Sequence, residues 1–504
     1  MTSFPRYRAL VPLVCLAFLL VASPAARADS PSSGGDVTVA QTLGDRELTV
    51  VLRRVTSVPG PLHLDVVTHA GTAPGRLSVA ARPGDASDPT ATATIELGAD
   101  PQAYSAIVTV DRPGPWELSL GDGVRTARIP FVVPVQVISP PERLVYGGFL
   151  AAGVLLLVSV VTATRARRTA WALLPAGGML AGLAVAVTAA VLSASLPLPP
   201  QPGTQLDPTV GNVTDPYALT QPPTGDYSRP PVVLTLAGAP VAGRAGDLGL
   251  NLTDGSTGLA VDDLIVHDAA LVHLLLIGPD GELWHEHPIR TAPGHYELHF
   301  TPPAPGHYAL SAELVRRGGG VQLVRAAAGI DVAGAPVTPA VPAPVRLGDR
   351  QLTDTATAGG TRVTVTTTTP PAAGEPTTVT ARVGDTDDLQ PWLGMAGHLI
   401  VAGPLPTGGP VGAAAQSAPV WAHVHAMGTM STMDASRPGM AGLPPLNGDS
   451  APDETVAGYG PDVPFTYTFP VPGRYRLWIQ VERRYAVLTV PVVLDVAPSA
   501  QETP

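Results

Sequence analysis

Most of the chain alternates hydrophobic and polar residues in short runs, which are separated by turns rich in Gly, Pro and Asp. In one such run, Tyr475, Leu477 and Ile479 occupy every second position. A period of two predicts strands with one buried face. Helical periodicity is almost absent from the regions with this pattern, which are 29–138, 230–333 and 345–497. We therefore predict a mainly β protein with three antiparallel β-sandwich domains of the immunoglobulin-like type.

Two uninterrupted hydrophobic runs, 144–163 and 170–196, interrupt this pattern. Each is long enough to cross a bilayer as a transmembrane helix. The loop 164–169 between them carries three arginines, and the positive-inside rule places such a loop in the cytoplasm. Residues 1–28 have the charged start, apolar stretch and small-residue cleavage site of a secretory signal peptide. We therefore expect a cell-membrane protein whose N- and C-terminal domains are extracytoplasmic.

Proline-rich segments separate the predicted domains. Residues 197–229 and 334–344 are expected to be linkers, and 498–504 a short tail. Two insertions rich in Gly, Pro and Ala, 403–420 and 428–458, interrupt the third domain. Long loops inside a compact domain are either functional or disordered. The second insertion contains methionines and is therefore the more informative of the two.

Composition excludes several classes of function. The net charge of −11 is spread along the chain and no basic patch is present, which argues against nucleic acid as a partner. The single cysteine, Cys15, lies in the predicted signal peptide, so the mature chain is expected to lack thiols and disulfides. No nucleophile–base–acid set is visible, and we predict that the protein is not an enzyme. The lysine-free, alanine-rich composition is typical of a high-GC bacterium such as an actinobacterium.

Histidines recur in the same arrangement in the second and third domains. Ten of the twelve lie between His267 and His425. In each domain a single histidine precedes a His-x-His pair, and residues two apart on a strand share one face. The candidate metal ligands are His273, His285, His287, His398, His423 and His425. The remaining histidines, including His63, His69, His267 and His299, are assigned structural or surface roles.

The hairpin of the second domain determines where its first histidine lies. Residues 278–282, Gly-Pro-Asp-Gly-Glu, are typical of a three-residue loop with glycine in the left-handed conformation. Such a loop places His273 opposite His287 and on the same face as His285. A loop of two or four residues would reverse the parity and turn His273 away. In the third domain the long insertion separates His398 from its His-x-His pair, so no register can be deduced there.

Methionines follow the second His-x-His pair at once. Met427, Met430 and Met433 lie in a stretch too rich in Gly, Ser and Thr to be core, with Met395 and Met440 as further candidates. Imidazole suits Cu(II), Zn and Ni, whereas thioether selects Cu(I). Both donor types outside the cytoplasm favour copper, with Cu(II) at the histidines and Cu(I) at the methionines. Zinc is the alternative metal for the three-histidine hairpin.

A structural role for the histidines is the competing interpretation. His273 shares its face with Leu275, Ile277 and Leu283, which is also the pattern of a hydrophobic core. Under this interpretation the protein is a non-enzymatic cell-surface scaffold or interaction protein. Imidazole rings that converge favour the metal site, and rings that point apart favour the scaffold.

Parts of the second and third domains resemble the YtkA-like domains of bacterial extracytoplasmic proteins, which are relatives of the CopC-like copper-resistance sandwiches. The matching stretches are 263–267, 272–276, 285–288, 305–308, 389–398, 423–425 and 472–475. The resemblance implies an immunoglobulin-like fold, a link to copper or other heavy metals, and the same six histidines as ligands. It covers roughly half of the expected mature chain.

The sequence departs from the CopC-like pattern at two places. Those proteins often bind Cu(II) with the mature N-terminal amine and a nearby histidine, but residues 29–31 have no histidine beside them. The usual His-x-His-Pro step ends here in Ala426. The step His425-Ala426-Met427 is similar to the His-x-Met step of periplasmic copper chaperones. A copper oxidase under assembly is the partner that this similarity implies. The membrane helices are also suited to association with a copper transporter, because Gly177, Gly178 and Gly182 permit close helix packing.

Overall fold

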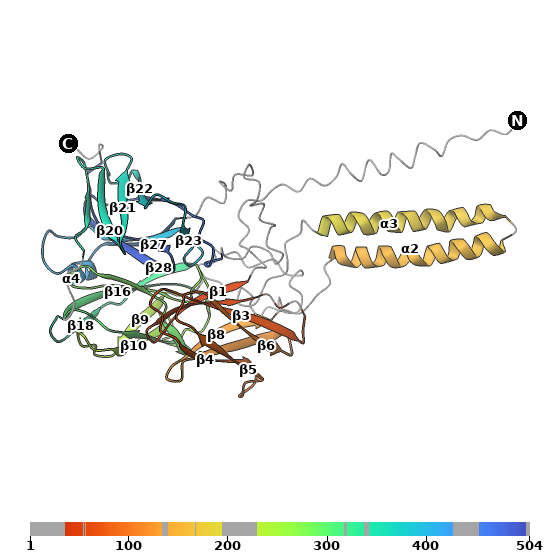
Figure 1. Ribbon diagram of the computed structural model, residues 1–504, viewed down its shortest axis with the longest axis horizontal. Coiled ribbons are helices and arrows are strands. Elements are labelled where there is room, and N and C mark those ends of the chain that lie inside the picture. The colour runs from red at the N-terminus through yellow and green to blue at the C-terminus, as the bar shows by residue number, and fades with distance from the viewer. Residues whose placement is uncertain are drawn as a thin grey trace.

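The chain forms three β-sandwiches and a pair of long helices, which confirms the predicted fold class (Figure 1). The computed structural model describes residues 36–53, 55, 57–133, 140–166, 168–193, 229–316, 320–336, 342–426 and 453–499. The predicted signal peptide, almost all of the linker 197–229 and the predicted ligands Met427, Met430 and Met433 lie outside these residues.

The first sandwich consists of two four-stranded antiparallel sheets, with strand orders β1-β2-β3-β6 and β5-β4-β7-β8. Alternation forms its core, since Leu62, Leu64 and Val66 of β3 are buried while His63 between them is exposed. The strands are β1 (Val37–Leu43), β2 (Arg46–Leu52), β3 (Gly60–Thr68), β4 (Gly75–Pro83), β5 (Ala91–Leu97), β6 (Ala103–Val110), β7 (Gly114–Gly121) and β8 (Thr126–Val133).

The second sandwich pairs a four-stranded sheet, β14-β15-β10-β9, with a six-stranded sheet built around β16. Strand β12 lies between β16 and β13 in the larger sheet. The strands are β9 (Val232–Ala237), β10 (Gly246–Asp254), β11 (Leu264–Ile265), β12 (His273–Ile277), β13 (Leu283–Glu286), β14 (Ile289–Ala292), β15 (His295–Phe300), β16 (Gly306–Arg316), β17 (Val321–Arg325) and β18 (Ile330–Val332).

The third sandwich pairs the sheet β20-β21-β22-β26 with a six-stranded sheet, β19-β28-β27-β24-β25, to which β23 adds at β27. The insertion 403–420, expected to be a loop, contains the short helix α4. The elements are β19 (Val345–Leu347), β20 (Thr353–Ala358), β21 (Thr361–Thr367), β22 (Pro376–Val383), β23 (Leu389–Gln390), β24 (Gly397–Gly403), α4 (Val411–Gln416), β25 (Val420–Ala426), β26 (Asp462–Thr468), β27 (Gly473–Arg483) and β28 (Ala486–Val496).

The larger sheets of the second and third sandwiches pack against each other with the faces that point away from their own cores. Leu275 of β12 and Ile400 of β24 meet there in an apolar cluster that also contains Trp478. The backbone N–H of Val411 in α4 donates to the carbonyl of Pro279, 2.7 Å away, and so joins the two sandwiches. Residues that one sandwich alone would expose are therefore buried between two. This junction positions the histidines.

Two antiparallel helices, α2 (Pro140–Arg165) and α3 (Leu173–Ser193), are joined through the 3₁₀ turn η1 (Thr169–Ala172). By length and composition both can cross a membrane: the apolar spans are Glu142–Arg165 and Ala170–Leu192, with mean hydropathies of 2.4 and 1.8. The first helix continues to Arg165, beyond the predicted end of the span at residue 163. At their crossing a Cβ on Gly148 would lie 2.7 Å from the carbonyl oxygen of Gly182. Glycine thus permits the close approach.

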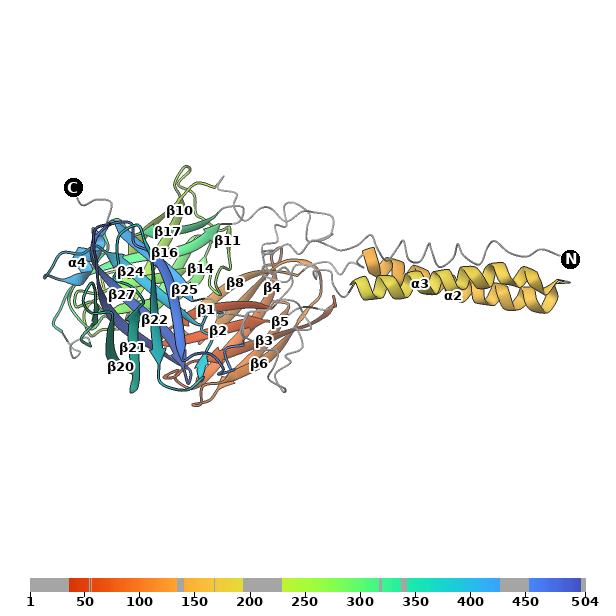
Figure 2. The same ribbon diagram turned by 90° about the horizontal axis from the view of Figure 1, so that it is seen from above.

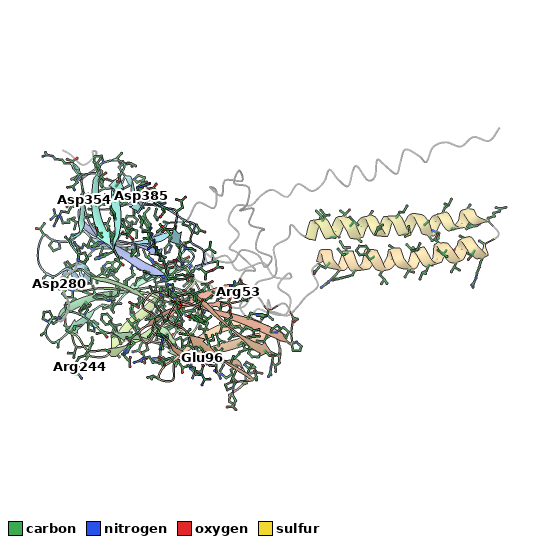
Figure 3. All side chains as sticks on the ribbon, viewed as in Figure 1. Arg53, Glu96, Arg244, Asp280, Asp354 and Asp385 are labelled. Atoms are coloured by element: carbon green, nitrogen blue, oxygen red, sulfur yellow. The ribbon has the colours of Figure 1, made fainter. Side chains whose placement is uncertain are left out.

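All three sandwiches lie at the open end of this helical hairpin, as two perpendicular views show (Figures 1 and 2). The side chains on the outer faces of α2 and α3 point into space that no described element occupies (Figure 3). Exposed apolar helix surface of this kind is suited to a lipid environment. The arrangement fits the predicted topology, in which the N- and C-terminal domains lie on the same side of the membrane. That this side is extracytoplasmic stays a prediction.

Candidate metal centre

The six predicted histidines come together in one place, at the junction of the second and third sandwiches. Nine pairs of their imidazole rings have centroids 4.4–5.4 Å apart. Most of the six side chains are fully buried, and only that of His425 is partly exposed. We call His273, His285, His287, His398, His423 and His425 the histidine cluster. The sequence placed three histidines in each domain without showing whether the domains share a site, and the structure makes them neighbours.

In the second sandwich the predicted hairpin register is confirmed. Leu275 pairs with His285, and the N–H of Gly278 donates to the carbonyl of Glu282 at 2.9 Å. Gly281 adopts φ 89°, the left-handed conformation that the three-residue loop requires. This register brings His273 level with His287, so both lie on the face that turns away from the sandwich core.

The third sandwich repeats this arrangement through a connection of a different kind. His398 of β24 pairs with His425 of β25, and Ile400 pairs with His423. His398 therefore corresponds to His273, and the pair His423 and His425 corresponds to His285 and His287. The two sandwiches meet with these equivalent faces against each other. Two surfaces with three histidines each therefore form one cluster of six histidines.

Equivalent tight turns precede the first histidine of each set. His267 and Ala270 bridge around one turn, and Trp392 and Met395 bridge around the other. The ring of Trp392 lies 5.1 Å from that of His285 and 5.0 Å from that of His398, measured between centroids. The indole therefore closes one side of the histidine cluster and excludes water from it.

Each His-x-His pair is held by side chains from a different sandwich. In the second sandwich, Nδ1 of His285 lies 3.1 Å from Oε1 of Gln480, and Nδ1 of His287 lies 2.6 Å from Oε1 of Glu47. Gln480 belongs to the third sandwich and Glu47 to the first. A ligating histidine usually donates its second ring N–H to such an oxygen, which fixes the tautomer and the ring orientation.

The third sandwich shows the reciprocal contacts. Nδ1 of His423 lies 3.4 Å from Oε2 of Glu313, and Nδ1 of His425 lies 3.3 Å from Oδ2 of Asp268. Both carboxylates belong to the second sandwich. Among the described residues, several ring nitrogens remain buried without a hydrogen-bond partner: Nε2 of His287, His423 and His425, Nδ1 of His423, and both nitrogens of His398. Apart from Nδ1 of His423, which lies beside Glu313, these nitrogens are free to bind a ligand.

Ligand atoms are close enough for metal binding in two triads. The nitrogens of His273, His285 and His423 lie within 4.8 Å of one another, and so do those of His398, His423 and His425. His287 belongs to neither triad at this distance. A third group, formed by His267, Asp268 and Glu313, lies at the partly exposed edge of the histidine cluster. His267, to which the sequence assigned a structural or surface role, lies at this edge.

Electrostatics favour the neutral form of four of the six imidazoles. Burial, with the neighbouring histidines, lowers the pKa of His273, His285 and His398 well below the ordinary value of 6.5. The same causes lower the pKa of His425 to about 4. Burial alone would raise the pKa of the Glu47 carboxyl, but contact with His287 outweighs it and lowers this pKa. These four neutral imidazoles, beside the Glu47 carboxylate, form an environment suited to a cation.

The first sandwich covers the side of the cluster formed by the second. The N–H of Thr42 donates to the carbonyl of His287, and the N–H of His287 donates to Oγ1 of Thr42, both at 2.8 Å. Nearby, Nδ1 of His69 lies 2.6 Å from Oε1 of Glu482 in the third sandwich. His69 is therefore an interdomain contact rather than a surface residue. Its pKa rises to about 9 because Glu482 and other carboxylates outweigh the effect of burial.

Several residues of the centre were not predicted from the sequence. They are Glu47, Asp268, Glu313, Trp392 and Gln480. Each contacts a histidine that lies far away in the chain or in another sandwich, so no local pattern identifies it. Only their positions gave a signal: Asp268 lies five residues before His273, and Trp392 lies six residues before His398.

Comparisons with known proteins leave the identity of the chain open. A family profile described as "Domain of unknown function (DUF8832)" matches residues 356–498, which is less than half of the chain. It is not a profile of YtkA-like or CopC-like domains, so that resemblance stays a prediction. No curated protein matches the sequence.

Solved structures with similar β architecture include surface proteins. A tetra-tandem repeat from the extending region of a large adhesion protein is 12% identical, with 93% of this chain and 75% of that chain covered and a TM-score of 0.15. A putative membrane anchored protein from Corynebacterium diphtheriae is 9% identical over 93% and 97% of the chains, with a TM-score of 0.13. Invasin, a bacterial integrin-binding protein, is 9% identical over 93% and 60%, with a TM-score of 0.12. At these TM-scores the similarity carries no argument about function.

Proposed function

We propose that this protein is a membrane-anchored, extracytoplasmic metal-binding protein, and that the metal is copper. The observation that carries the proposal is the buried histidine cluster with its unpartnered ring nitrogens. A buried polar atom without a partner costs about 1–3 kcal/mol, and several such atoms converge here. A bound cation would offset that cost, whereas a purely structural cluster has no evident compensation.

Copper is favoured by the donor atoms. Imidazole suits Cu(II), Zn and Ni, and among these Cu(II) binds most tightly. The predicted thioether ligands Met427, Met430 and Met433 begin two residues after His425 in the sequence and would supply the soft donors that Cu(I) prefers. Zinc is the second candidate metal, because neutral imidazoles also suit tetrahedral zinc. The proposed role is non-catalytic: the protein buffers, senses or hands over copper beside the membrane.

The alternative is a cell-surface scaffold or interaction protein with structural histidines. The contacts of His287 with Glu47 and of His285 with Gln480, each of which joins two sandwiches, are what this alternative requires. The neutral histidines between two sandwiches would then act only as interface residues. A copper transporter or an oxidase under assembly is a proposed partner under the metal-binding interpretation alone.

The test is metal binding by the full chain in detergent. Cu(II), Cu(I) and Zn(II) are titrated in competition with a chromophoric chelator of known affinity. We expect tight copper binding that is lost in His398→Gln, because both nitrogens of this buried ring are free. His295→Gln, at an exposed position, is the matched control and should bind like the wild type. Binding no tighter than that of an unrelated histidine-containing membrane protein would leave the scaffold as the better proposal.

A further inference from the structure

The histidine cluster contains more ligands than one ion uses. Zinc in proteins is usually four-coordinate, and Cu(II) sites built from nitrogen and oxygen are tetragonal. Six imidazoles with mutually close rings therefore exceed the needs of a single ion. The two triads of close ligand atoms have only His423 in common.

Each sandwich by itself supplies a triangle of rings of the right size. Three imidazoles bound to one ion at about 2.0–2.1 Å, in a tetrahedral arrangement, have ring centroids about 5 Å apart. In the second sandwich the three centroid distances are 5.1–5.3 Å. In the third sandwich they are 4.4–5.2 Å. The ring spacing therefore fits one ion in each sandwich, and the ligand atoms are closest in the two groups His273, His285, His423 and His398, His423, His425.

The two triangles are also supported in the same way. Glu313 lies beside His273 in the second sandwich and contacts His423 of the third. Gln480 lies beside His398 in the third sandwich and contacts His285 of the second. Each triangle is therefore oriented by the strand next to the opposite triangle. Such reciprocity orients the rings of both sandwiches in the same way, which favours a site in each.

The charge around the rings fits more than one cation. Glu47, Asp268 and Glu313 contact histidines of the cluster. Among the described residues, the charged partners of these three carboxylates are histidines and not arginines. Three carboxylates exceed the charge of one divalent ion.

We infer that the histidine cluster is a dinuclear centre. One ion binds at His273 and His285, and the second binds at His398 and His425; the ligand atoms of His423 lie within 4.8 Å of those of both pairs. The two positions adjoin where the rings of His285 and His423 approach to 4.9 Å between centroids. This inference rests on the proposed metal-binding function and adds the number and the arrangement of the ions.

The experiment measures the metal content of the full chain in detergent. The protein is loaded with Cu(II) or Zn(II), dialysed and analysed for metal per chain. The wild type should hold two ions. The double variants His273→Ala/His287→Ala and His398→Ala/His425→Ala should each hold one. The control His63→Ala/His295→Ala changes two exposed histidines and should still hold two.

Electron paramagnetic resonance of the copper-loaded protein tests whether the ions are neighbours. We expect dipolar broadening and a half-field transition in the wild type, and an isolated Cu(II) spectrum in each double variant. One ion per chain in the wild type overturns the dinuclear centre but leaves the proposed function intact. Two ions with an isolated Cu(II) spectrum also overturn the dinuclear centre. A chain that binds no ion contradicts both the dinuclear centre and the proposed function. The wild-type results decide the question even if a variant does not fold.

Discussion

The second and third sandwiches present the same three-histidine face but differ in how that face is closed. His287, the outer histidine of the second sandwich, is 1% exposed and is held by Glu47 from the first sandwich. His425, its counterpart in the third, has a side chain that is 17% exposed and contacts Asp268, which is also 17% exposed. One half of the cluster is thus sealed by another domain, and the other half borders solvent.

This difference indicates how a buried centre can still exchange its ion. A site that is closed on every side releases its ligand only when domains separate, whereas a partly exposed histidine offers a route without such opening. His267, Asp268 and Glu313 form a further set of donor atoms at the exposed border. The chain continues from β25 directly into the predicted methionine run. We therefore expect ions to enter and leave on the side of the third sandwich.

The largest expected effect tests whether the two halves are equivalent in binding. His285→Ala and His423→Ala remove corresponding rings, and each should weaken metal binding by at least about 100-fold, because ligand loss exceeds the 10–100-fold cost of losing an outer-shell partner. Competition titration of the full chain measures both. Variants that differ strongly from each other would show that only one half of the cluster binds metal. His295→Ala, at an exposed position, serves as the control.

The second prediction is that acid lowers the stability of the folded, metal-free chain through the histidines of both halves of the cluster. The pKa of His425 is about 4 in the folded chain, against an ordinary value of 6.5, so between these values the unfolded chain binds a proton that the folded chain does not. The folded state therefore loses stability as the pH falls from 6.5 to 4, by about 3 kcal/mol for this residue. Burial has the same effect on His273, His285 and His398.

Thermal melting of the metal-free full chain between pH 7 and pH 4 measures this effect. The midpoint should fall with pH, and bound Zn(II) should reduce the fall because it occupies the nitrogens that protons would take. His425→Gln should flatten the curve. The His69–Glu482 contact does not produce the same signal, since a pKa of about 9 means that its stabilisation is lost as the pH rises. A midpoint that is constant from pH 7 to pH 4 would contradict the prediction.

The sequence was sufficient for the parts of the site that depend on local chemistry. Alternation predicted the sandwiches, and the Gly278–Glu282 loop fixed the face of His273. The face shared with Leu275 was compatible with core or with a metal site, and the structure explains why: it is the buried junction between two sandwiches. Whether two such faces meet depends on packing between domains, which no local period encodes.

The same limit applies to the residues that orient the rings. Glu47 stands in an alternating strand of the first sandwich, 240 positions from His287, and nothing in its surroundings identifies it. The register of the third sandwich was unreadable because α4 occupies the connection between β24 and β25. The sequence of a short turn fixes the register of the two strands that it joins, whereas the sequence of a long connection does not.

The smallest expected effect sharpens the contrast between the sealed and the exposed half. Glu47→Gln keeps the size of the side chain but removes the charge beside Nδ1 of His287, so the affinity of the second-sandwich ligands should fall about tenfold. The third-sandwich ligands, which do not contact Glu47, should keep theirs. Glu96→Gln, whose carboxylate lies on the surface of the first sandwich, is the matched control. Stepwise competition titration of the full chain resolves the two affinities. An equal loss at both would mean that the first sandwich stabilises the whole junction rather than orienting one ring.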